Sequence, residues 1–180
     1  MRLTRGRHAG VRGLRRLSTI ASMTSPWLPP DFVHPLRVEI APNAHIRPIS
    51  PDDTEIDMPA VMGNQQMLWD KYGEEWGWPP TDMTAEEDRK DLARHADEMV
   101  THESFNYAIL QSDESSLWGC IYIDPAEAEA GADGPVAEVS WWVVPDAAPG
   151  VADAVAQFVP AWLAREWPFA SVRYPFGEVG

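Results

Sequence analysis

Three stretches of sequence decide the fold: SFNYAIL at 104–110, SSLWGCIYID at 115–124 and PVAEVSWWVVP at 135–145. Each is rich in β-branched and aromatic residues, and residues that favour turns separate one from the next. They predict three consecutive antiparallel strands. Both faces of this predicted sheet are largely apolar. The sheet therefore needs helices on both sides.

The flanking sequence supplies those helices. The segment TAEE at 84–87 is a capping box, and it predicts a helix that runs to about residue 102. A helix with Asp57 as its N-cap is predicted over 57–70, where the sequence KYG at 71–73 would end it. Apolar residues at helical spacing predict another helix over 151–163. A last apolar strand is expected at 170–176.

The rest of the chain divides by composition. Two short strands at 35–40 and 44–49 are predicted to form a hairpin. With 180 residues the chain suits one folded domain, which we place at 44–180 after an Arg-rich tail at 1–22 and a Pro-rich extended arm at 23–43. The fold class is α/β in the α+β sense, with a central, mostly antiparallel sheet and helices on both faces.

The charge of the chain is unevenly distributed. The sequence has 14 Lys and Arg against 28 Asp and Glu, which gives a formal net charge of −14 at pH 7. Six of the arginines and none of the acids lie in residues 1–22, so the remainder is more acidic still. An acidic domain repels nucleic acid and anionic membranes and attracts small cations. We therefore expect no nucleic-acid partner and no membrane partner.

The tail at 1–22 has two interpretations. It is rich in Arg, contains Ser and Thr and lacks acids, which is the composition of an organellar transit peptide. An over-extended start before Met23 explains the same pattern. Since no apolar run is long enough for a transmembrane helix, we expect a cytoplasmic protein, or an organellar one if the tail directs import. The oligomeric state is left open.

Four aromatic residues lie close together within ten positions of the sequence: Trp69, Tyr72, Trp76 and Trp78. Rigid aromatic faces can wall a substrate pocket and attract an ammonium group by cation–π contact. The same side chains could instead anchor a loop to the domain. His95 and His102 lack a third ligand at metal-binding spacing, so we expect no metal.

The order of the elements resembles the GNAT superfamily of acyl-CoA-dependent N-acyltransferases. The resemblance rests on IRPISPDD at 46–53, the two helices after it, the three antiparallel strands, the next helix and SVRYP at 171–175. It implies acetyl-CoA as co-substrate, placed between the strand EVSWWVV at 138–144 and the last strand. The pyrophosphate would lie at the N-terminus of the helix that begins near residue 151, where free N–H groups favour a phosphate.

The cofactor contacts that the resemblance implies lie at the end of a strand and in the turn after it. They are the backbone N–H groups of Val143 and Val144, for the thioester carbonyl, and Gly150, Val151, Ala152 and Ala154, for the pyrophosphate. Two neighbours depart from the family pattern. Pro149 replaces a basic or amide side chain, and Asp153 adds a negative charge.

Two functions remain open at this stage. The first is an acyl-CoA-dependent N-acyltransferase, with acetyl as the expected group, that acts on a small cationic amine. Glu138 or Ser140 would then face the cleft, where a carboxylate could take a proton from the amine. The alternative is a non-catalytic GNAT-like binding or interaction module that has lost coenzyme A binding. Pro149, Asp153 and a carboxyl end shorter than the family's suggest this alternative.

Overall fold

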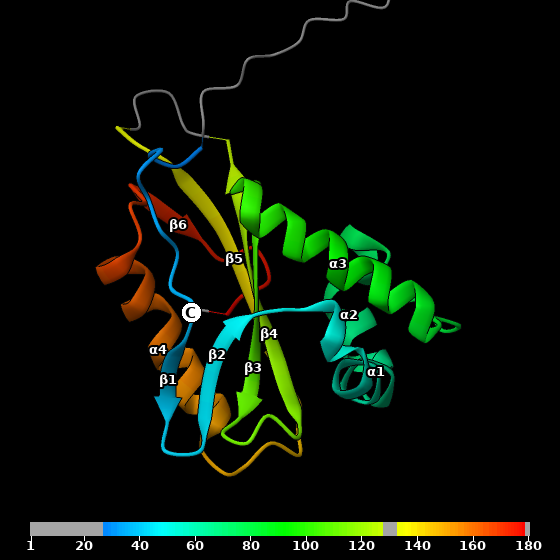
Figure 1. Cartoon of the computed structure of the whole chain (residues 1–180). Helices are drawn as coiled ribbons and strands as arrows, with labels where there is room; N and C mark the ends of the chain where they lie inside the picture. The colour runs from blue at the N-terminus through cyan, green and yellow to red at the C-terminus, as the bar shows by residue number, and fades with distance from the viewer. Residues whose placement is uncertain (1–26, 128–132, 179–180) are drawn as a thin grey trace, which may run out of the picture.

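A computed structural model describes residues 27–127 and 133–178, and in these residues six strands form one sheet (Figure 1). The strands lie in sequence order: β1 (Val38–Ala41), β2 (Ala44–Pro48), β3 (Phe105–Gln111), β4 (Leu117–Ala126), β5 (Val136–Val143) and β6 (Ser171–Arg173). Neighbouring strands are antiparallel except β5 and β6, which are parallel. The tail predicted at 1–22 lies outside the described residues.

Helices cover both faces of the sheet, as predicted (Figure 1). One face carries α1 (Thr54–Gly63), α2 (Gln65–Trp76) and α3 (Ala85–Thr101), which follow the short 3-10 turn η1 (Pro51–Asp53). The other face carries α4 (Val151–Glu166). The predicted α+β fold class is therefore confirmed. Within the described ranges, no helix has the length and apolar character that crossing a bilayer requires.

Alternation along the strands divides their side chains between the two faces. Tyr107 and Trp162 of α4 pack edge to face with their ring centres 5.3 Å apart, so odd-numbered residues of β3 point towards α4. Tyr122 of β4 packs against Trp76 of α2 at 5.3 Å, so even-numbered residues of β4 point the other way. Both faces of the three central strands are buried, which confirms the expectation of a doubly covered sheet.

Two local predictions are confirmed. Thr84 caps α3: its Oγ1 accepts from the Glu87 N–H at 3.3 Å, and the Glu87 carboxylate accepts from the Thr84 N–H at 2.9 Å. The predicted first hairpin is formed by β1 and β2. Both features depend on residues close together in the chain, which is why the sequence indicates them.

Two elements were predicted with the wrong boundaries. The helix expected over 57–70 begins at Thr54, breaks at Asn64 and continues as α2 to Trp76, before Gly77 takes a left-handed φ of 64°. Asp57 is no cap; it lies inside α1 and is 3% exposed. The last strand is shorter than expected, because the chain turns away after Arg173.

An ion-pair network positions the start of α1. Arg47 in β2 donates to the two carboxylate oxygens of Asp53 at 2.7 and 2.8 Å and to Glu114 at 2.9 Å. Glu114 also lies 2.9 Å from Nε2 of the buried His45. Since Asp53 precedes α1 directly, this network fixes the helix that carries Asp57.

The packing of α4 gives a first prediction. Trp162→Ala should reduce the free energy of unfolding by about 3 to 5 kcal/mol, because it removes a fully buried indole between α4 and the sheet. Trp69→Ala, at a position 41% exposed, is the control and should cost much less. Urea unfolding followed by circular dichroism measures both. Equal losses in the two variants would contradict this account of the core.

Candidate functional site

The parallel contact between β5 and β6 covers only the first part of β5. It joins residues 136–138 to residues 171–173. β5 continues to Val143, and no strand of the described chain pairs with that edge beyond Glu138. The second half of β5 therefore has one open edge beside α4.

The direction of the backbone groups on β5 follows from its pairing with β4. The Val144 N–H donates to the Trp118 carbonyl at 2.8 Å, and successive residues direct their backbone groups to opposite edges. Consequently the Val143 N–H and the Trp141 carbonyl point to the open edge. Val144 was expected to offer an N–H to a ligand, but this structure has that group already bonded, which leaves Val143 as the donor.

A groove of about 280 Å³ runs beside the open edge to the start of α4. We call it the β5–α4 groove; it is lined by Met67, Leu68, Lys71, Trp141, Trp142, Val143 and Ala152. Gly150, the N-cap of α4, has a left-handed φ of 84° and open space around the position of a Cβ. The N–H groups of Val151 and Ala154 are bonded to Ala148 and Gly150 at 3.1 and 2.9 Å. Four residues were predicted to contact the pyrophosphate, and of these only Ala152 lines the groove.

A lysine occupies the open edge in this structure. The Lys71 ammonium donates to the Trp141 carbonyl at 2.8 Å and lies 2.9 Å from a carboxylate oxygen of Glu178. The Glu178 side chain is 2% exposed. Any other group that bonds the Trp141 carbonyl must therefore displace or share with Lys71.

On the face of the sheet that α2 covers, Glu138 and Ser140 line a second cavity of about 350 Å³, which we call the β5 cleft. Glu138 is half exposed and lies 3.9 Å from Arg173, whereas Ser140 is buried. The hydroxyls of Ser140 and Tyr72 are buried without a hydrogen-bond partner in the described part of the chain. Burial raises the pKa of Tyr72, although the nearby Ser140 hydroxyl lowers it in part. Tyr72 thus remains protonated at neutral pH.

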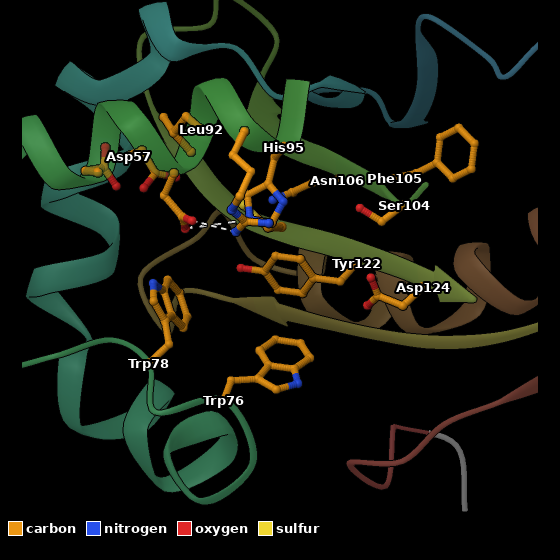
Figure 2. Close-up of a pocket in the computed structure, with 14 residues that line it drawn as sticks. Asp57, Trp76, Trp78, Leu92, His95, Ser104, Phe105, Asn106, Tyr122 and Asp124 are labelled. Carbon is orange, nitrogen blue, oxygen red and sulfur yellow. Dashed lines mark hydrogen bonds and ion pairs between the residues drawn. The ribbon is translucent and has the colours of Figure 1, made fainter. Parts of the chain in front are cut away.

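A third cavity, of about 340 Å³, lies between α3 and the sheet, and we call it the α3 cavity (Figure 2). Aromatic side chains form one side of it: Trp76, Trp78 and Tyr122. Tyr72 lies beneath them and stacks on Trp76 at 4.4 Å with an interplanar angle of 3°. Trp69 is 41% exposed and lines neither this cavity nor the β5 cleft. The structure thus brings together three of the four predicted aromatic residues.

The polar floor of the α3 cavity was not predicted. Asp57 of α1, Asp88 of α3 and Asn106 of β3 line it, and each is 3% exposed. Burial raises the pKa of Asp57 well above its usual value, and the facing Asp88 raises it further. The arrangement therefore favours the protonated form of Asp57. Strand alternation offered the one available signal, because Asn106 and Tyr122 lie opposite each other on one face.

Asp124 joins the two cavities. Its side chain and that of Trp76 line the α3 cavity (Figure 2) and also the β5 cleft. Burial raises the pKa of Asp124 to about 6, while the neighbouring His95 opposes this rise. A carboxylate with such a pKa can accept a proton near neutral pH. Across residues 27–127 and 133–178, no group of three His, Cys, Asp or Glu side chains is arranged to hold a metal ion.

Comparisons with known proteins identify the fold. No protein-family model and no curated protein matches the chain. A ribosomal-protein alanine acetyltransferase from Vibrio fischeri matches with a TM-score of 0.52 at 14% identity, over 72% of this chain and 68% of that one. The RimL ribosomal-protein acetyltransferase with coenzyme A gives 0.57 at 15% identity, over 74% and 70%. The microcin self-immunity acetyltransferase MccE, with acetyl-CoA and AMP, gives 0.53 at 9%, over 72% and 67%. The chain thus has the fold of the GNAT acetyltransferases, as the sequence predicted.

The environment of Asp124 gives a pH prediction. Its pKa is raised in the folded chain, so the folded state is penalised once the carboxyl ionises. Relative to Asp124→Asn, the wild type should lose up to about 2 kcal/mol of stability as pH rises from about 4 to about 6, and no more above that. Urea unfolding of both proteins across this range measures the difference.

Asp113→Asn is the matched control. The pKa of the exposed Asp113 is lowered by hydrogen bonds from the Ser115 hydroxyl and N–H, so its contribution should have the opposite sign and grow with rising pH. If wild type and Asp124→Asn show the same pH dependence, Asp124 is not the titrating group described.

Proposed function

We propose that the chain is an acyl-CoA-dependent N-acetyltransferase that acts on a small amine. The observation that carries this proposal is the open edge of β5, with a groove beside it that leads to the first turn of α4. An unpaired strand edge can bond an extended amide chain as a neighbouring strand would. The pantetheine arm of coenzyme A is a chain of this kind, and its phosphates are anions suited to a helix N-terminus.

The residues of the groove fit coenzyme A in chemistry. The Val143 N–H and the Trp141 carbonyl offer one donor and one acceptor to an amide, and Met67, Leu68 and Trp142 supply apolar walls. At α4, the first-turn N–H groups of Ala152 and Asp153 have no carbonyl within the helix to bond. Coenzyme A supplies the acetyl thioester. The RimL and MccE structures contain coenzyme A and acetyl-CoA, which supports the same cofactor here.

The proton transfers are assigned to groups on the face of the sheet that α2 covers. Asp124 is mainly ionised at neutral pH and takes a proton from the acceptor ammonium, directly or through water. The amine nitrogen then bonds to the thioester carbon, and the carbon–sulfur bond breaks. The departing sulfur takes the second proton of the acylated nitrogen, directly or through water, because Tyr72 is fully buried and lines none of the three cavities. Glu138 lies opposite Asp124 in the sheet and keeps the cleft attractive to cations.

The small-amine acceptor is inferred from the walls of the cavities. The RimL acetyltransferase acts on a ribosomal protein and MccE confers immunity to a microcin, so the related folds serve different acceptors. Here the β5 cleft and the α3 cavity are acidic and aromatic hollows partly open to solvent, which favours a small cation.

A module that has lost coenzyme A binding is the second candidate. The contact of Lys71 with the Trp141 carbonyl and Glu178 favours it, because that contact fills the open edge. Calorimetric titration of the whole chain with acetyl-CoA tests the choice, together with thiol release in the presence of amines. Saturable binding and amine-dependent release are expected. Flat titrations at millimolar acetyl-CoA would exclude the acetyltransferase function and leave the binding module as the proposal.

Charge at the first turn of α4 gives a third prediction. Asp153→Asn should tighten acetyl-CoA binding about two- to fivefold, because it removes repulsion between a carboxylate and the phosphates. Gly150→Val should weaken binding, since a branched side chain would enter the open space at this turn and strain its left-handed backbone. Calorimetry gives both affinities.

Asp97→Asn on the exposed side of α3 is the control for Asp153→Asn and should bind like wild type. An equal gain in both variants would mean that overall charge, rather than the start of α4, sets the affinity. Melting curves show whether Gly150→Val remains folded.

A further inference from the structure

The floor of the α3 cavity contains hydrogen-bond acceptors that the described chain leaves unused. Asp88 Oδ2 and Asn106 Oδ1 are buried and have no hydrogen-bond partner among residues 27–127 and 133–178. Asp57 lies beside Asp88, and all three side chains line the same cavity (Figure 2). An unpaired buried acceptor is costly. A ligand with several N–H donors would complete this arrangement.

The charge balance of the cavity favours a cation. Two basic side chains also line it, but both are already paired: Arg94 lies 2.5 Å from Asp91 and 2.6 Å from Glu98, and His95 lies 3.1 Å from Glu98. Asp57 and Asp88 have no ion pair with a basic side chain in the described part of the chain. The floor of the cavity therefore has two carboxyl groups without a basic partner.

The opposite side of the cavity suits the same ligand. Trp76, Trp78 and Tyr122 present aromatic rings, and Trp76 and Tyr122 meet at 5.3 Å in an edge arrangement. The Tyr122 hydroxyl accepts a hydrogen bond from Trp142 Nε1 at 3.0 Å, which fixes the ring. Aromatic faces attract an organic cation, whereas they offer nothing to a hydrated metal ion. The unused acceptors select a primary ammonium group over a quaternary one, which has no N–H to donate.

The geometry points to the α3 cavity as a binding site for a primary ammonium group of a small organic cation. Because Trp76 and Asp124 also line the β5 cleft, a ligand anchored in the cavity extends towards Glu138 and Ser140. The acyl acceptor is then a diamine, with one amino group held under α3 and the other exposed to the acetyl group. This second step rests on the proposed acetyltransferase function; the binding site does not.

A buried acid pair can also serve only to join α1 to α3, and proton release separates the two roles. Burial and the charges of neighbouring carboxylates favour the protonated form of the Asp57–Asp88 pair. An ammonium group that binds between the two carboxyl groups neutralises their charge in place of the proton. The proton is therefore released to solvent. A pair that only joins the helices would release none.

The test is calorimetry on the full chain without acetyl-CoA, with putrescine and butylamine as probes in two buffers of different ionisation enthalpy. Putrescine should bind at least about tenfold more tightly than butylamine, because it offers a second ammonium to charged acceptors. Its binding should release about one proton per ligand. Butyltrimethylammonium, which has no N–H to donate, should bind more weakly than butylamine.

Asp88→Asn should lose the preference for putrescine and the proton release, while Asp113→Asn, in the exposed turn between β3 and β4, should retain both. Failure of both amines to bind, or unchanged behaviour of Asp88→Asn, would overturn the site, whereas equal affinity for the two amines would overturn the diamine. Should Asp88→Asn fail to fold, the wild-type comparison of the three ligands and the proton count decide alone.

Acetyl transfer then separates this inference from the proposed function. If putrescine binds with proton release but is not acetylated, the binding site is supported and the acetyltransferase function is excluded. Transfer to butylamine and putrescine with equal efficiency overturns the diamine and leaves the enzyme in place.

Discussion

The short contact between β5 and β6 is the constraint on which the rest of the site depends. Because β6 pairs only with residues 136–138, the second half of β5 presents backbone groups that a full strand would otherwise bond. The Trp141 carbonyl obtains a partner from Lys71, a side chain of α2. The β5–α4 groove lies along this edge, and the β5 cleft lies on the adjoining face. A longer β6 would remove the groove and leave no room for an extended cofactor.

Local features of the fold were predictable and long-range ones were not. The three central strands and the cap at Thr84 follow from residues near one another in the chain. The row formed by Asn106, Tyr122 and Ser140 across three strands depends on register, and the register shifts between Ile109 and Leu110. Strand alternation alone does not fix such a row. For this reason Asn106 was missed as part of the floor of the α3 cavity, and Asp57 and Asp88 were missed because they come from two helices far apart in the chain.

The aromatic cluster was misplaced because a glycine was interpreted as a helix stop. Gly73 lies inside α2, where a Cβ would come within 2.6 Å of the Trp69 ring, so glycine is present for close packing. Tyr72 and Trp76 are four residues apart, which places them on one face of the helix and explains their stacking. Trp69 lies two turns before Trp76 on nearly the same side of α2, so its position along the helix, not the spacing, keeps it out of the cavities. The helical spacing of the aromatic residues was the signal that could have corrected the prediction.

Lys71 and an amide of coenzyme A would compete for the Trp141 carbonyl, and the outcome decides between enzyme and binding module. A hydrogen bond from an ammonium is worth about 1.5 to 3 kcal/mol, against about 0.5 to 1.5 kcal/mol for one from a neutral amide. Replacement of Lys71 by a pantetheine amide is therefore unfavourable at that atom, and the loss must be offset elsewhere. The apolar walls of the groove and the first turn of α4 can offset it, although Asp153 weakens the second. A displaced Lys71 would remain beside the groove with its charge intact, and an incoming phosphate could use that charge in place of the missing basic residue at Pro149.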